Sequence, residues 1–331
     1  MLRFLACVCS VLLLTTAPAS AQTLPALNAT LDGLDYPYPV QYLPLMLEGQ
    51  AVRMAYMDVP GSGSGNGRTV VLLHGKNFFG AYWRETIKAL SAKGFRVVVP
   101  DQVGFGKSDK PNIQYSFHQL ARNTHRLLDT LGVRQAVVVG HSMGGMLATR
   151  FALLYPQQTA QLVLENPIGL EDYRVGVPFQ SVDEAEATER KSTEASIRKY
   201  HATYYPHGYP VAHDQWLLPL VAQTRHPDFP QVARANALTF EMIYQQPVCY
   251  EFSRLTVPTL LIIGQDDRTV VGKGLIKDAA VLARMGQYPA LGQRTAAQIK
   301  GAKLVPLKGL GHIPHLEAPA AFQTALLGFL Q

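Results

Sequence analysis

One serine of this chain has a sequence context that can make it a nucleophile. Residues 140–145 read GHSMGG, which matches the pattern G-x-S-x-G with Ser142 at its centre. The run follows an apolar stretch typical of a buried strand and precedes helical spacing, so a sharp turn should hold the hydroxyl above the sheet edge. Gly140 and Gly144 relieve the crowding of such a turn, and the helix N-terminus offers free N–H groups and a positive dipole end. The pattern predicts that Ser142 attacks a carbonyl group.

The serine needs a base, because a neutral hydroxyl is a weak nucleophile. His312 is the best candidate, since it lies in the run GLGHIPH (309–315) on the loop after the last apolar strand. His315, at the start of the last helix, is the local alternative. His141 is expected to point away from the turn and pack, and His74 is expected to shape the loop after its strand.

An acid must hold the tautomer of this base and stabilise the imidazolium. The apolar run 258–263 is followed by GQDDR. Asp266 and Asp267 therefore both lie at the carboxyl end of a strand, where parallel sheets build their sites. The chain order serine, aspartate, histidine suits this type of site. The residues alone leave both aspartates open, and one of them is a solvated turn residue.

The developing oxyanion needs two N–H donors. The first is expected to be the backbone N–H of Met143, directly after the nucleophile. The second should come from the loop after strand 69–73, which reads HGKNFFG. Gly75 allows the backbone to approach closely, so the Lys76 N–H is the predicted second donor. The Lys76 side chain is expected to be solvated.

Short apolar runs and helical stretches alternate along the chain. The runs are apolar throughout, so each strand should be covered on both faces. The alternation predicts an α/β chain with a mostly parallel, doubly wound sheet. Strands are expected at 52–59, 69–73, 95–99, 136–139, 161–164, 258–263 and 303–307, and helices at 81–93, 116–131, 143–155 and 318–330.

The alternation is interrupted between residues 166 and 257. A crossover between parallel strands needs only about a dozen residues or slightly more. The surplus predicts an inserted cap, or lid, which is helical over 181–200 and 230–245. Residues 22–50 are Pro-rich and are expected to form an extended N-terminal arm. The predicted organisation is a signal peptide (1–21), an arm (22–50), a core (51–165 and 258–331) and a cap (166–257).

The first 21 residues have the form of an export signal. Arg3 supplies a short positive region, residues 4–14 are apolar, and the segment ends at Ala21 in a small-x-small site. This pattern predicts a secretory signal peptide cleaved after Ala21, and a periplasmic or secreted mature protein. The apolar run is shorter than the roughly 20 residues of a membrane anchor, so no transmembrane anchor is expected. Cys249 would be the last cysteine left, which excludes an internal disulfide.

The composition narrows the function classes. The 331 residues are 47% hydrophobic and 16% charged, which provides one large core and excludes a disordered chain. The net charge is +6, but the basic residues are scattered and form no block. A nucleic-acid or polybasic membrane role is therefore not expected.

No metal or cofactor is expected. His201, His207 and His213 are six residues apart, which is neither a helical nor a zinc-finger interval, so they are assigned to a polar cap loop. The glycine-rich run 61–67 lacks the ending of a phosphate loop. Four cap aromatics could either line an acyl pocket or form the core of the cap: Tyr204, Tyr205, Tyr209 and Trp216.

Together these motifs resemble the α/β-hydrolase superfamily, in its serine-nucleophile, esterase- and lipase-like branch with an inserted cap. They run in the family order over residues 50–331. The resemblance implies that Asp267, three residues after Gly264, is the acid rather than Asp266. The matching pieces are His74-Gly75, Trp83, the run DQVGFGKS (101–108), residues 140–145, residues 264–268 and Gly311-His312.

Two positions depart from relatives of this superfamily. Lys76-Asn77 stands where many relatives have an apolar residue and proline, which bears on the substrate class rather than the fold. The turn carries Ser142 and not aspartate, which argues against the haloalkane dehalogenases and epoxide hydrolases that share the layout.

The sequence predicts an exported serine hydrolase that cleaves a small or medium carboxylic ester through an acyl-enzyme on Ser142. Hydrolysis of a lactone, of a C–C bond in a diketone, or of an aminoacyl bond would use the same triad, as would cofactor-free perhydrolysis. A non-catalytic small-molecule binding protein on the same fold is the alternative from another class.

Overall fold

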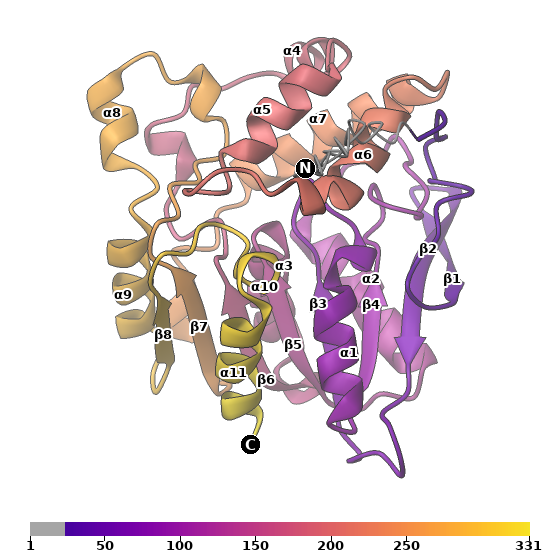
Figure 1. The fold of residues 1–331 in the computed structure, drawn as a ribbon, viewed down its shortest axis with the longest axis vertical. Coiled ribbons are helices and arrows are strands. Elements are labelled where there is room, and N and C mark those ends of the chain that lie inside the picture. Colours follow the sequence, from indigo (N-terminus) through magenta and orange to yellow (C-terminus); the bar gives the residue numbers. More distant parts are fainter. Residues whose placement is uncertain (1–23) are drawn as a thin grey trace, which may run out of the picture.

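The computed structural model describes residues 24–331, and the predicted signal peptide lies outside them (Figure 1). Within this range an eight-stranded sheet has the order β1-β2-β4-β3-β5-β6-β7-β8. Strands β3 to β8 run parallel to one another, while β2 pairs antiparallel with both β1 and β4. The strands are β1 (Val40–Leu47), β2 (Gln50–Val59), β3 (Thr69–Leu73), β4 (Arg96–Pro100), β5 (Ala136–His141), β6 (Thr159–Glu165), β7 (Thr259–Gly264) and β8 (Lys303–Leu307).

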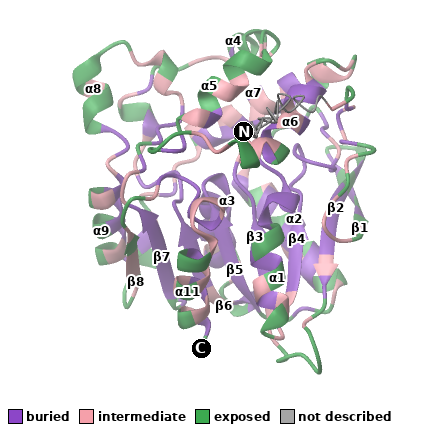
Figure 2. Cartoon of the chain, in the orientation of Figure 1, coloured by how far each residue is buried: buried purple, intermediate pink, exposed green. Residues whose placement is uncertain are grey.

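Helices cover both faces of the sheet, so the central strands are apolar on both sides. Strand β3 contributes to two core clusters, one on each face. Val71 and Leu73 belong to one cluster, and Val70 and Leu72 belong to the other. Helices α2, α3 and α9 pack in one cluster, and α1 and α11 pack in the other. Figure 2 shows the central strands as largely buried, whereas the edge strands β1 and β8 contain exposed residues. These helices are α1 (Arg84–Ala92), α2 (Phe117–Thr130), α3 (Met143–Leu154), α9 (Tyr288–Gln298) and α11 (Pro319–Leu330).

Part of the segment expected to form the N-terminal arm is paired into the sheet. Residues 40–47 form β1, the edge strand of the sheet, and pair with β2. Leu43, Leu45 and Leu47 face the core while the residues between them are exposed. Pro44 fits because an edge strand has one side without ladder hydrogen bonds. The prolines favour extended chain, which a strand also is, and the alternating leucines explain why this part pairs with β2.

The segment between β6 and β7 contains four helices that lie above the carboxyl ends of the strands (Figure 1). The single helical stretch expected over 181–200 is two helices. Thr193 accepts a hydrogen bond from the Ser196 N–H and begins a new helix there, so the chain turns after Glu189. The lid helices are α4 (Val182–Glu189), α5 (Glu194–Ala202), α6 (Asp214–Gln223) and α7 (Phe229–Gln245).

Two short helices complete the fold. Helix α8 (Ala279–Arg284) lies between β7 and α9, and α10 (Pro314–Glu317) directly precedes α11. No helix in residues 24–331 is long and apolar enough to cross a membrane.

Candidate active site

Ser142 lies at a strained turn between β5 and α3. Its φ of 56° and ψ of −120° are rarely adopted by a residue with a side chain. A Cβ added at Gly140 would lie 2.1 Å from the Gly144 carbonyl oxygen, and one at Gly144 would lie 2.1 Å from the Leu73 carbonyl oxygen. Only glycine fits at these two positions, and the turn therefore places the serine at the carboxyl edge of the sheet.

The chain brings three polar side chains into one hydrogen-bonded row. His312 Nε2 lies 2.9 Å from Ser142 Oγ, and His312 Nδ1 lies 2.7 Å from Asp267 Oδ2. Asp267 follows β7 and His312 follows β8, so the carboxyl ends of neighbouring parallel strands bring the groups together. Because a carboxylate can only accept, Nδ1 carries the proton and Nε2 is free to accept from the serine hydroxyl.

The surroundings keep Asp267 ionised although it is fully buried. Burial by itself raises the pKa of this carboxyl, but the facing His312 and hydrogen bonds outweigh that effect and leave the pKa below its ordinary value. Thr269 donates its backbone N–H to Oδ1 at 2.8 Å, and Asn166 donates its side-chain N–H to Oδ2 at 2.8 Å.

Sequence reasoning did not single out Asn166. The residue follows β6, is fully buried and has a φ of 35°. Its side-chain oxygen accepts the Gly264 N–H at 2.9 Å, so it links the end of β6 to the loop that carries Asp267. Its place at the carboxyl end of a predicted strand was the signal that could have identified it.

The two adjacent aspartates have different environments. The Asp266 side chain is 41% exposed and lies 3.4 Å from the exposed His207. The Asp267 side chain is 1% exposed and contacts His312. The structure therefore brings Asp267 into the row and leaves Asp266 at the surface.

The other histidines near the turn are occupied elsewhere. His315 is buried, lies 3.0 Å from the Glu165 carboxylate and stacks on Trp83 at 4.1 Å. His141 Nε2 lies 2.8 Å from the His312 carbonyl oxygen. His74 accepts a hydrogen bond from the Gln102 N–H at 3.0 Å, which ties its loop to the next strand end.

The loop after β3 approaches the serine closely. A Cβ added at Gly75 would lie 3.1 Å from the Ser142 Cβ, closer than nine in ten real contacts of this kind. The Gly75 N–H donates to the Tyr82 hydroxyl at 3.0 Å, which fixes the direction of the loop. The structure records no hydrogen-bond partner within residues 24–331 for the N–H groups of Lys76 and Met143. Both amides flank the serine and can donate to an oxygen bound there.

A cavity of about 640 Å³ opens above the serine, between the sheet and the lid. The Lys76 side chain was expected to be solvated, but the residue is half-buried and lines this cavity. Burial lowers the pKa of its ammonium group. The cavity wall is largely apolar and includes Phe78, Phe105, Ile168, Ile197, Val232 and Phe240.

Comparison with known proteins gives the family. The model of the alpha/beta hydrolase fold matches residues 68–318. The chain belongs to the α/β-hydrolase fold family. It is a hydrolase, as its named relatives in this family are.

Three relatives illustrate the range of this family. A crystal structure described as a "probable hydrolytic enzyme" from Pseudomonas aeruginosa is 49% identical, with a TM-score of 0.90 over 93% of this chain and 99% of that one. A 2-hydroxy-6-oxononadienedioate/2-hydroxy-6-oxononatrienedioate hydrolase of Burkholderia vietnamiensis is 29% identical over 75% of this chain and 89% of its own length. An enol-lactonase structure from Burkholderia xenovorans is 23% identical, with a TM-score of 0.66 over 87% of this chain and 99% of its own, and shows the shared fold.

The cap aromatics of this hydrolase divide between the two expected roles. Tyr204 lines the cavity and stacks on the His312 ring at 4.9 Å, and its carbonyl accepts the His312 N–H at 2.9 Å. Its hydroxyl accepts a hydrogen bond from the Asn77 side chain at 2.8 Å. Tyr205 and Trp216 are buried in a hydrophobic core cluster, and Tyr209 packs edge-on against Tyr205.

The three cap histidines do not converge. His201 packs edge-on against Phe78 at 5.3 Å, while His213 Nδ1 lies 3.0 Å from the Tyr205 hydroxyl. His207 is exposed. Residues 24–331 contain no group of three or more side chains placed to hold a metal ion.

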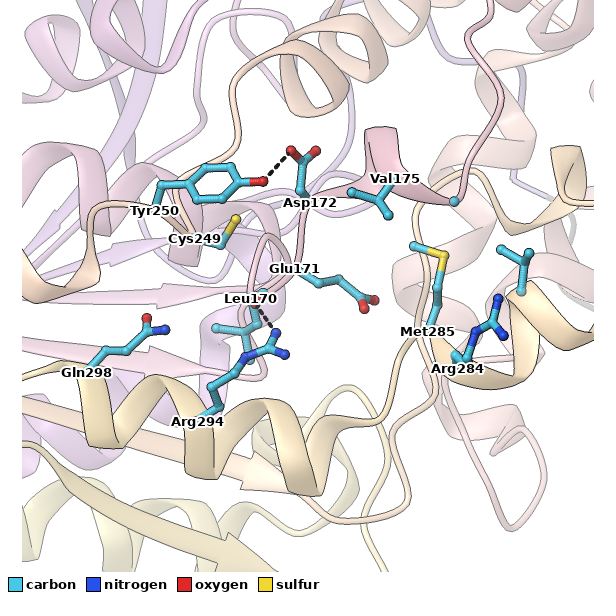
Figure 3. Close-up of a pocket in the computed structure, with 12 residues that line it drawn as sticks. Leu170, Glu171, Asp172, Val175, Cys249, Tyr250, Arg284, Met285, Arg294 and Gln298 are labelled. Atoms are coloured by element: carbon cyan, nitrogen blue, oxygen red, sulfur yellow. Dashed lines mark hydrogen bonds between the residues drawn. The ribbon is translucent and has the colours of Figure 1, made fainter.

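A second cavity, of about 450 Å³, lies beside Cys249 and α9 (Figure 3). Its polar groups are mostly engaged: Tyr250 donates to Asp172 at 2.9 Å, and Arg294 donates to the Leu170 carbonyl at 3.1 Å. Burial raises the pKa of the Cys249 thiol, which disfavours the reactive thiolate. Ser142 lines the first cavity and is not among the described residues that line this second one.

Proposed function

We propose that this protein is an exported serine hydrolase that cleaves a small or medium carboxylic ester through an acyl-enzyme on Ser142. The observation that carries the proposal is the unbroken row Asp267, His312 and Ser142, with contacts of 2.7 and 2.9 Å. A buried row of this kind lets one proton move between the serine and the reacting oxygen at neutral pH.

The first half-reaction acylates the serine. Ser142 Oγ attacks the ester carbonyl carbon while His312 Nε2 takes the hydroxyl proton. The carbonyl oxygen becomes an oxyanion and accepts the N–H groups of Lys76 and Met143. The C–O bond to the alcohol then breaks, and His312 gives its proton to the leaving oxygen.

The second half-reaction frees the acid. Water enters the place of the alcohol, and His312 takes one of its protons as the water oxygen attacks the acyl carbon. The oxyanion forms again at the same two amides. When it collapses, Ser142 Oγ leaves and regains its proton from His312.

The size of the cavity supports a small or medium substrate. Pockets for small molecules typically have volumes of about 300–1,000 Å³, and the cavity above Ser142, at about 640 Å³, lies within that range. Its largely apolar wall suits an acyl or alcohol chain.

A second candidate is hydrolysis of an oxo-dicarboxylate or a lactone on the same triad. It is supported by the relative from Burkholderia vietnamiensis, whose name describes a 2-hydroxy-6-oxo-dioate as the substrate. A panel of short-chain aryl esters, lactones, 6-oxo-dienoates and aminoacyl anilides distinguishes these reactions by the product formed.

The nucleophile is tested by labelling with an active-site phosphonate and mass spectrometry. We expect a single adduct on Ser142 and loss of aryl-ester turnover. Ser142→Ala should lower kcat by at least a thousandfold, while Ser64→Ala in an exposed loop should not change it. A Ser142→Ala variant with unchanged turnover would refute the proposal. Ligand binding without any product would favour the binding-protein alternative.

Export is part of the proposal and rests on the residues before Ala21. Expression of the full chain in a bacterial host, followed by mass spectrometry of the protein outside the cytoplasm, should give an N-terminus at Gln22. Retention of the full-length chain in the cytoplasm would contradict this part of the proposal.

A further inference from the structure

One cation in the cavity above Ser142 has no partner among the residues that the structure describes. The Lys76 ammonium group makes no hydrogen bond or ion pair that the structure records within residues 24–331. Such an isolated charge in a largely apolar, half-buried place is costly unless a counter-charge arrives. Among the described residues that line the cavity, Glu189 is the only acidic one, and it makes no ion pair with Lys76.

The other charged groups of the cavity are placed differently. Lys110 is buried, but its ammonium group donates to the carbonyls of Gly106 and Ser108 at 2.9 and 3.1 Å. Lys191 is exposed at the rim. Three lysines and one glutamate line the cavity, so its charge is positive overall.

Glu189, the last residue of lid helix α4, lines the same cavity. It is the acidic group whose charge acts on the Lys76 ammonium. The two groups form no ion pair. Glu189 instead accepts a hydrogen bond from the Asn236 side chain at 3.3 Å. Lys76 lines the cavity, and its ammonium group has no hydrogen-bond or ion-pair partner among residues 24–331, so it is available to a ligand.

We propose that the Lys76 ammonium group binds a carboxylate on the acyl part of the substrate, so that the substrate is a half-ester of a dicarboxylic acid. This inference rests on the proposed ester hydrolysis and specifies its substrate class. The Lys76 amide holds the carbonyl oxygen under attack, and the ammonium group lies at the end of the same residue's four-carbon stem. One residue thereby sets the separation between the scissile carbonyl and the distal carboxylate.

A matched pair of substrates tests the proposal. The 4-nitrophenyl half-esters of adipate and suberate carry the distal carboxylate, and 4-nitrophenyl hexanoate and octanoate lack it. The readout is the ratio of kcat/KM for the anionic ester to that for the neutral ester of the same length. A ratio cancels any general effect of a substitution on the triad or on the oxyanion amides.

Substitutions at Lys76 should change this ratio in a fixed order. Lys76→Gln should lower it by about tenfold to a hundredfold, as expected when a charge-assisted hydrogen bond is lost. Lys76→Glu should lower it further, and Lys76→Arg should retain most of it. Lys88→Gln, on the exposed face of α1, is the matched control and should leave it unchanged. Equal ratios in wild type, Lys76→Gln and Lys76→Glu would overturn the proposal.

A binding measurement separates this inference from the proposed function. The Ser142→Ala variant should bind adipate dianion, as measured by calorimetry. Adding Lys76→Gln to this variant should raise the dissociation constant for adipate by at least tenfold. If the wild type hydrolyses no ester but this binding difference is present, ester hydrolysis fails and the anion site stands. If esters are hydrolysed but adipate binds equally with and without Lys76, the anion site fails and the proposed function stands.

Discussion

At the scale of single residues, the environment of a side chain, rather than its type, decides whether it belongs to the site. Asp266 and Asp267 are neighbours with the same side chain, but only Asp267 is buried against His312 and held by Asn166 and Thr269. Three hydrogen bonds to the charged form stabilise it in a place where burial alone would raise its pKa. The same carboxylate then keeps the His312 proton on Nδ1.

This difference makes the two aspartates a matched pair of substitutions. Asp267→Asn should lower kcat by about three to four orders of magnitude, because an amide that donates to Nδ1 leaves the proton on Nε2, where it faces Ser142. Asp266→Asn should leave kcat unchanged within about twofold. Steady-state kinetics on one aryl ester measures both variants, with circular dichroism to confirm folding. A similar loss in the two variants would exclude Asp267 as the specific partner of His312.

The sequence could predict the members of this row but not everything that holds them. Ser142 and His312 follow from local motifs, since G-x-S-x-G and the loop after the last strand are short-range patterns. The choice of Asp267 needed the family resemblance, because both aspartates have the same local context. Asn166 has no motif of its own: its role comes from contacts with Gly264 and Asp267, which are distant in the chain.

At the scale of elements, the turn from β5 to α3 depends on backbone contacts between strands and helix. The Gly144 position in α3 lies so close to the end of β3 that an added Cβ would be 2.1 Å from one carbonyl oxygen and 2.8 Å from the next. Neither neighbour is a flexible side chain. The helix can therefore approach the sheet closely enough to present Ser142 only if this residue is glycine.

Substitutions at two helical glycines test the close contact between α3 and the end of β3. Gly144→Ala should lower the free energy of unfolding by about 1–3 kcal/mol, since overpacking against backbone forces α3 away from β3. Gly328→Ala in α11 should raise it by about 0.5–1 kcal/mol, because that glycine is exposed and an added Cβ meets nothing within 4 Å. Urea denaturation measures both. Stabilisation by Gly144→Ala would show that α3 and β3 do not touch as described.

Some elements of the fold could be predicted from the sequence and others could not. The central strands were predictable because each is a continuous apolar run covered on both faces. Strand β1 falls within the segment expected to be an extended arm. The Pro-rich composition indicates extended chain but does not show that it pairs with the sheet, and an edge strand tolerates Pro44. The division of the lid into α4 and α5 depends on the cap at Thr193, a local signal inside a stretch that otherwise favours one helix.

At the scale of the whole molecule, a buried turn after β4 connects the N-terminal segment to the site. Asp101 accepts hydrogen bonds from the Tyr36 hydroxyl at 2.6 Å, the Gly80 N–H at 2.6 Å and the Lys107 N–H at 2.7 Å. The loop that carries Lys76 ends at Gly80, so the N-terminal segment and this loop share one carboxylate. The turn closes on Lys110, whose ammonium group is buried against two backbone carbonyls.

This buried lysine makes the stability of the folded protein depend on pH in the alkaline range. Burial lowers the pKa of Lys110 from 10.5 to about 8. Between these two values the unfolded chain binds more protons than the folded chain, so this group makes stability rise with pH, by up to about 3 kcal/mol. Lys110→Met lacks that contribution. The free energy of unfolding of this variant, relative to wild type, should therefore be greatest below pH 8 and should decline toward pH 10.

Urea denaturation at pH 7, 8, 9 and 10 measures this difference. Lys300→Met, at an exposed position, is the control and should give a pH profile parallel to that of wild type. Parallel profiles for Lys110→Met as well would mean that the two carbonyls offset the cost of burying the charge.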